Sequence, residues 1–182
     1  EHLVSPNRIH YWWIGQWGKA YPTAIKWASP GVEAAVKALG WDFDRQLSNN
    51  DGTPWANELN QLRITGSRFL EEYIFFHKSS KTLVLADLIE NFELDRVPSR
   101  WVRFLLTCAG NTDPDGKLPI DLRLSYFGRH NQLSDAINTM IDWQPERVIV
   151  AHGRWYSQDG VKELQRAFRW VKGVGIRHDL EQ

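Results

Sequence analysis

The sequence predicts an α/β protein with mixed sheets, and three observations carry that prediction. Strands and helices alternate over the first 40 residues, which is typical of parallel strands joined by crossover helices. Residues 73–86 read as a hairpin, which adds antiparallel pairing. Residues 82–86 and 147–151 are continuous apolar runs, as expected for buried strands. We expect a single domain over residues 1–182, a length that buries a substantial core.

The N-terminal elements follow from local chemistry. Residues 3–5 are apolar and Pro6 ends that strand, after which Asn7 can cap a helix by accepting a backbone N–H. Residues 9–17 are apolar on nearly every side, which predicts a buried helix. A strand is predicted over residues 24–29, and a helix over residues 32–39.

The part of the chain after residue 40 contains further predicted strands and helices. After a loop at residues 49–54, strands are predicted over residues 59–64 and 71–77. Further helices are predicted over residues 99–109, from Ser134 to Trp143, and from residue 158 onward. The helix at 99–109 carries Trp101, Phe104, Leu105 and Cys108 on one face, so we expect Cys108 to be a core thiol.

Composition excludes several classes of protein. Lys plus Arg and Asp plus Glu both number 22, and this zero net charge argues against a nucleic-acid partner. No run approaches the roughly 18 apolar residues of a membrane-spanning helix, so we expect no membrane partner. One cysteine excludes an intrachain disulfide and fits a cytoplasmic protein. The ten tryptophans predict a Trp-rich core, with a stacking surface as the alternative.

Two of the predicted buried strands end in a titratable residue. Asp87 follows residues 82–86, His152 follows residues 147–151, and His10 lies just after the first strand. Ligands of α/β proteins gather at such strand ends. If these three side chains meet, they form a mononuclear site with open positions, suited to one zinc or iron(II) ion that activates water. The alternative is that each is an ordinary turn or hydrogen-bonding residue.

An ordered set of segments along nearly the whole chain resembles a divergent branch of the metallo-beta-lactamase-like superfamily. The resemblance implies an αββα sandwich with mixed sheets and a metal site at one end between the sheets. It implies a hydrolase of esters, amides, thioesters or phosphodiesters, or iron redox chemistry. The matching segments are Ser5–His10, Gly15–Trp17, Tyr21–Pro22, Gly66–Phe69, Phe76–His77, Thr82–Phe92 and Val148–Trp155.

The same resemblance implies that the N-terminal strands of the fold are missing from this chain. One sheet would then expose an unpaired edge, which suggests a missing segment or an oligomer.

The metal motifs of the superfamily are only partly kept. Its first motif, His-x-His-x-Asp-His, corresponds to Arg8, His10, Trp12 and Trp13, of which only His10 can bind a metal. Its Gly-His pair corresponds to Gly66-Ser67, and serine is a poor zinc ligand. Its bridging acid and last histidine correspond to Asp87 and His152. The resemblance therefore implies one zinc or iron ion held by His10, Asp87 and His152, or no metal.

Two functions remain open at this point. The sequence slightly favours a non-catalytic binding or assembly module, with a protein partner, in which Arg8, Trp12 and Trp13 fill the former metal cavity. The alternative is a mononuclear metal-dependent hydrolase with Asp87 and His152 as its catalytic residues.

In the enzyme, a small-molecule substrate is expected to contact Arg8, His77 and Trp155. Each of these has a structural alternative. Arg8 would pair with Asp87, His77 would form a turn hydrogen bond, and Trp155 would pack at the surface.

Overall fold

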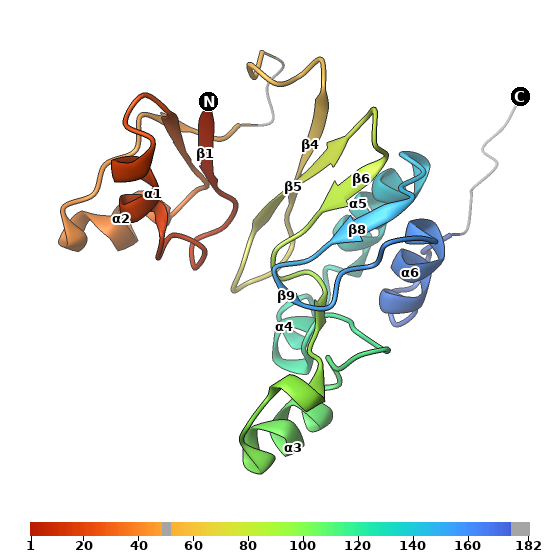
Figure 1. Ribbon diagram of the computed structural model, residues 1–182. Helices are drawn as coiled ribbons and strands as arrows, with labels where there is room; N and C mark the ends of the chain where they lie inside the picture. Colours follow the sequence, from red (N-terminus) through yellow and green to blue (C-terminus); the bar gives the residue numbers. More distant parts are fainter. Residues whose placement is uncertain (49–51, 176–182) are drawn as a thin grey trace, which may run out of the picture.

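The computed structural model describes residues 1–48 and 52–175, so the predicted loop at 49–54 lies partly outside the described residues. Two sheets form the centre of the molecule, and helices lie on the outer side of each (Figure 1). This is the predicted αββα arrangement with mixed sheets.

The first sheet is parallel and is built from the N-terminal residues. Its strand order is β1-β2-β3, and within the described residues β1 pairs only with β2, which leaves its other edge unpaired. The helical segments of this part lie on one side of the sheet (Figure 1). The elements are β1 (His2–Ser5), α1 (Ile14–Ala20), β2 (Ile25–Ala28), α2 (Val32–Val36), η1 (Lys37–Leu39) and β3 (Arg45–Gln46).

The second sheet is mixed, with strand order β4-β5-β6-β8. The strands β4, β5 and β6 are antiparallel neighbours and confirm the predicted hairpin, whereas β8 runs parallel to β6. Because β6 and β8 are parallel neighbours, the residues that follow them leave the sheet at the same edge. The strands are β4 (Leu59–Ile64), β5 (Glu72–His77), β6 (Thr82–Val84) and β8 (Arg147–Ile149).

At that edge a short parallel pair, β7 with β9, extends the structure beyond the sheet. Its pairing sets His152 beside Glu90. The elements not yet named are β7 (Glu90–Asn91), η2 (Leu94–Arg96), α3 (Arg100–Ala109), α4 (Ile120–Ser125), α5 (His130–Asp142), β9 (His152–Gly153) and α6 (Gly160–Ala167).

The main core lies between the second sheet and the helices α5 and α6. Leu83 and Val148 of the sheet and Ile137 and Leu164 of the helices are fully buried. Each such side chain contributes about 1.5–3 kcal/mol of burial free energy. A smaller cluster of Trp27, Leu47, Trp55 and Tyr73 joins the first sheet to β5.

The prediction of a buried helix over residues 9–17 is wrong. The helix begins only at Ile14, and the preceding residues form turns. The reason is that the Asn7 side chain accepts the backbone N–H groups of Ile9 and His10 and closes a turn there. The Trp-rich core describes only half of the ten tryptophans, since Trp27 and Trp55 are buried and three more pack against a core. The other five are exposed: Trp12, Trp13, Trp17, Trp101 and Trp155.

The helix α3 differs from prediction in its surroundings. The helix covers nearly the predicted span and Ser99 caps it, but it buries no residue, and Cys108 is exposed instead of lying in the core. The helix stands apart from the two sheets (Figure 1), so its apolar face has little to pack against. The helix α5 begins at His130, earlier than the predicted start at Ser134.

Among the helices of residues 1–48 and 52–175, none has the length and hydrophobicity needed to cross a membrane.

Gly153 is a position where the fold requires glycine. Its φ is +93°, and an added Cβ would collide with the backbone of Asn91.

We expect Gly153→Ala to lower the free energy of unfolding by more than Gly128→Ala. Gly128 has a φ of +79° but open space around the Cβ, so its variant carries only the backbone strain of about 1–2 kcal/mol. Urea denaturation of both variants measures the loss in the free energy of unfolding. Equal losses in Gly153→Ala and Gly128→Ala would show that the close approach of Gly153 to the Asn91 backbone does not affect stability.

Candidate metal centre

Three elements bring His10, Asp87 and His152 together. His10 lies in the turn after β1, Asp87 follows the end of β6, and His152 begins β9 after β8. The Nε2 atoms of His10 and His152 lie 3.0 and 3.1 Å from the same carboxylate oxygen, Asp87 Oδ1. The two Nε2 atoms are 3.3 Å apart. The structure thus joins residues that are far apart in the sequence.

The spacing of these atoms fits a metal ion. Ligand atoms about 2.0–2.1 Å from a tetrahedral zinc ion are separated from one another by about 3.3 Å. The three observed separations of 3.0, 3.1 and 3.3 Å are close to that value. Two imidazole nitrogens and one carboxylate oxygen are also a donor set that zinc and iron(II) accept, with positions left for water or substrate. The residues present therefore fit one ion.

Asp87 is held in its ionised form. Its side chain is almost fully buried, and burial alone would raise its pKa. The hydrogen bonds with the imidazoles of His10 and His152, together with one from Asn7, outweigh burial and hold the pKa of Asp87 below its ordinary value. An ionised carboxylate is the form that binds a cation.

A buried layer behind the three side chains fixes their positions. Glu72, 2% exposed, accepts the backbone N–H groups of Ala86 and Asp87 at 2.6 and 2.7 Å. Asn7, fully buried, donates to Asp87 Oδ2 at 2.6 Å while its own oxygen accepts the N–H of His10 at 3.0 Å. Glu72 and Asn7 thus orient the candidate ligands without being ligands themselves.

Sequence reasoning missed Glu72. A charged residue beside Glu71 reads as solvent-facing, although its place at the start of the apolar strand β5 is a sign of burial. Burial and the nearby Asp87 carboxylate raise the pKa of Glu72 to about 7. Asn7, expected to be a helix cap, caps the turn that carries His10.

The ring of His152 is oriented by its neighbours. Phe92 stacks on it with ring centroids 5.9 Å apart, and His10 meets it edge-on at 5.2 Å. The hydrogen bond to Asp87 raises the pKa of His152 above its ordinary value, against the opposing effect of burial.

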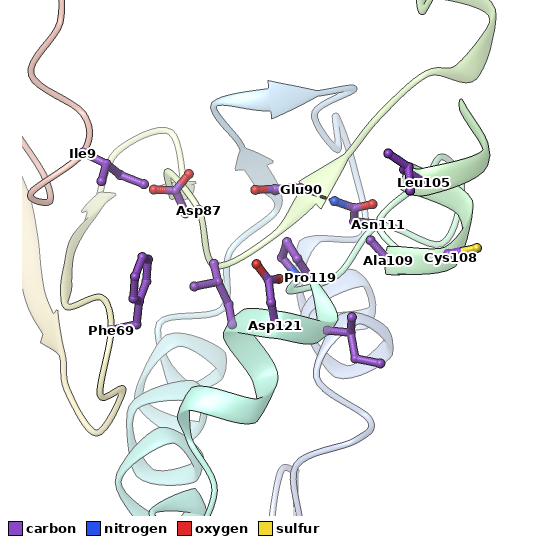
Figure 2. Close-up of a pocket in the computed structure, with 12 residues that line it drawn as sticks. Ile9, Phe69, Asp87, Glu90, Leu105, Cys108, Ala109, Asn111, Pro119 and Asp121 are labelled. Atoms are coloured by element: carbon purple, nitrogen blue, oxygen red, sulfur yellow. Dashed lines mark hydrogen bonds between the residues drawn. The ribbon is translucent and has the colours of Figure 1, made fainter. Parts of the chain in front are cut away.

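A pocket of about 560 Å³ lies on the Asp87 side of the cluster. Figure 2 shows Asp87, Glu90 and Asp121 around it, with Ile9 and Phe69 on the same side as Asp87 and with Leu105 and Cys108 on the opposite side. Burial raises the pKa of Glu90, and Asn111 donates a hydrogen bond to its carboxylate. The sequence did not identify Glu90 or Asp121 as a pocket residue, because each lies at or near the start of a short element, where no pattern marks it.

A second pocket, of about 490 Å³, lies on the imidazole side. Both His10 and His152 line it, together with Trp12, Trp13 and Trp17. The prediction that Trp12 and Trp13 fill the former metal cavity is therefore wrong. Each indole is 64% exposed and forms part of a pocket wall, because the turn after Asn7 directs them outward.

The other predicted site residues lie around or away from this centre. The Arg8 guanidinium lies over the Phe69 ring, 4.7 Å from its centroid, and Asp87 is bound by imidazoles instead. His77 is at the opposite end of β5 from Glu72 and bonds Ser80 in the hairpin turn. Trp155 is 48% exposed and lines neither pocket.

Ser67, at the position corresponding to the Gly-His pair, also lies outside the cluster. Its hydroxyl accepts the N–H groups of Phe69 and Leu70 and so stabilises a turn.

The two-sheet arrangement is similar to that of solved metallo-beta-lactamase structures, which shows the fold of this chain. The DIM-1 metallo-beta-lactamase matches 92% of this chain with a TM-score of 0.53 and 15% identity, over 68% of its own length. A metallo-beta-lactamase from Hirschia baltica matches 90% with a TM-score of 0.55 and 12% identity, over 66% of its length. Rubredoxin oxygen:oxidoreductase from Desulfovibrio gigas matches 94% with a TM-score of 0.59 and 14% identity, over 44% of its length.

These comparisons confirm the fold that the sequence motifs predicted. The chain spans about two thirds of the length of the lactamases that it matches. Neither a protein-family model nor a curated protein sequence matches it.

The role of Glu72 can be tested with Glu72→Ala, using Glu71→Ala as the control. The first variant leaves two buried N–H groups beside Asp87 without an acceptor, whereas Glu71 pairs with Arg63 near the surface. We expect Glu72→Ala to weaken Co²⁺ binding by about 10- to 100-fold and Glu71→Ala to leave it unchanged. Cobalt absorption titration at a temperature where both variants are folded gives the affinities. An unaltered affinity in Glu72→Ala would refute the positioning role.

The coupling between Asp87 and His152 predicts a pH effect. In metal-free protein, Asp87→Asn removes the charge that favours the imidazolium, so the pKa of His152 should fall. NMR titration of the His152 imidazole in the presence of a chelator measures this pKa. The control Asp135→Asn, on α5, should leave that pKa unchanged. A His152 pKa that stays the same in Asp87→Asn contradicts the geometry.

Proposed function

We propose that this protein binds one metal ion through His10, Asp87 and His152 and acts as a mononuclear metal-dependent hydrolase. The observation that carries the proposal is the convergence of two imidazole nitrogens and one ionised carboxylate at mutual distances of 3.0–3.3 Å. The pockets on both sides of this cluster give a small-molecule substrate access to it.

The bound ion and the residues of the chain would have different roles in the reaction. A bound zinc or iron(II) ion would acidify water and polarise the carbonyl or phosphoryl oxygen of an ester, amide, thioester or phosphoester. Asp87 supplies negative charge, and the positions of His10 and His152 are fixed by Asn7 and Phe92.

Substrate binding is proposed for residues at the rims of the two pockets. Arg8 lies over Phe69, a wall residue of the pocket in Figure 2, and so could bind an anionic group at its mouth. The proposed substrate contact of Trp155 rests on its exposure and its closeness in sequence to His152. For His77, the bond to Ser80 supports the structural alternative.

The second candidate function is a non-catalytic binding or assembly module in the same fold. It is favoured by one observation: Asp87 is fully hydrogen bonded by protein groups, so the cluster does not require an ion for its polar balance. A cytoplasmic location, indicated by the cysteine count, applies equally to both candidates.

Metal analysis separates the two candidates. The hydrolase should bind one equivalent of zinc or iron, and His10→Ala and His152→Ala should each lose it, because two remaining ligands hold a metal poorly. His130→Ala, a histidine on α5, is the control and should bind one equivalent. Inductively coupled plasma mass spectrometry after dialysis measures the stoichiometry. An unaltered wild-type melting temperature in chelator, together with no bound metal, would overturn the hydrolase and favour the module.

A further inference from the structure

The pocket on the imidazole side has walls of unusual composition. Three exposed indoles, Trp12, Trp13 and Trp17, line it together with aliphatic side chains, a proline and the two imidazoles. Among residues 1–48 and 52–175, no lysine, arginine, aspartate or glutamate lines this pocket. The indole end of the pocket therefore favours an uncharged group, because a charged group would lose its hydration there without gaining an ionic partner.

Two of the three indole rings stack on neighbouring tyrosines. Trp12 stacks on Tyr11 with ring centroids 5.1 Å apart and planes inclined by 22°, and Trp17 stacks on Tyr21 at 5.6 Å and 22°. Such stacking limits the orientations that each ring adopts, so less entropy is lost when a flat group binds against it. Exposed apolar surface gathered at one place marks a binding site more often than a chance arrangement.

The pocket is continuous with the candidate metal centre. His10 and His152 belong to its wall, and their Nε2 atoms are the ones that meet Asp87. A molecule bound against the indoles therefore extends to the site where hydrolysis is proposed. The volume of about 490 Å³ falls within the range of about 300–1,000 Å³ that small-molecule sites show.

We propose that this pocket binds a flat, uncharged, apolar group of the substrate, such as an aromatic ring, and so sets the hydrolysable bond beside His10 and His152. This inference rests on the proposed hydrolase function for the position of the reacting bond. Binding of the flat group itself depends only on the indole walls. The substrate class is then a compound whose arm on this side of the centre is uncharged and aromatic or similarly flat, and any anionic group of the substrate lies on the other side, near Arg8.

The test uses 1-naphthol, a neutral aromatic probe, and the metal-free full chain. Isothermal titration calorimetry is performed on the wild type, on Trp12→Ala, on Trp13→Ala and on the double variant. The matched control is Trp101→Ala, which removes an equally exposed indole, stacked on Phe104 in α3. The three substituted side chains, Trp12, Trp13 and Trp101, are largely exposed in the folded protein, and melting curves verify that each of the four variants is folded. Zinc stoichiometry is measured on the same samples.

The proposal predicts saturable binding of 1-naphthol at one site. Each pocket variant should weaken it by roughly 2- to 10-fold, the double variant more, and Trp101→Ala should leave it unchanged. All variants should still bind one zinc ion. Absence of saturable binding, or equal weakening by Trp101→Ala, overturns the proposal even if zinc binds. Normal naphthol binding without any zinc binding would refute the metal centre and leave the pocket assignment standing.

A competing occupant is a second copy of the chain. Light scattering during size-exclusion chromatography distinguishes it. A dimer that Trp12→Ala or Trp13→Ala dissociates would overturn the small-molecule assignment, whereas the same mass for wild type and variants supports it.

Discussion

The structure of the candidate site depends on one buried carboxylate. Asp87 lies at the point where β6 leaves the second sheet, and its Oδ1 atom meets both His10 and His152. Without that charge, two imidazoles 3.3 Å apart would have no common partner. Every chemical property assigned to the site, from metal binding to the direction of the His152 pKa shift, follows from this contact.

The fold keeps this carboxylate in place by using residues with no direct chemical task. Glu72 at the start of β5 binds the backbone of Asp87, and Asn7 after β1 binds its side chain. Because Asn7 follows β1 of the first sheet and Asp87 follows β6 of the second, the hydrogen bond between them also connects the sheets at the end where the site lies. The cost of burying Glu72 is met by the two amides it accepts. Stability and site geometry are therefore linked, which is typical of second-layer groups around metal centres.

Much of this could be predicted from the sequence, because the relevant patterns are local. Apolar runs identified the strands that end before Asp87 and His152, and the motif resemblance identified the fold that brings them together. The burial of Glu72 and the exposure of Trp12 and Trp13 were not predictable in this way. An amphipathic pattern shows which residues share a face, as for Trp101 and Phe104 of α3, but not whether another element covers that face. Whether another element covers an apolar face depends on tertiary packing and on single interactions, such as the hydrogen bonds by which Asn7 closes its turn.

The most direct test of the central claim is the location of a bound ion. Crystals soaked with zinc and measured at the zinc absorption edge would show it by anomalous scattering. We predict one strong peak about 2.0–2.2 Å from the Nε2 atoms of His10 and His152 and from an oxygen of Asp87. A fully soaked crystal with no peak there, or with its strongest peak at other carboxylates such as Glu90 and Asp121, would contradict it.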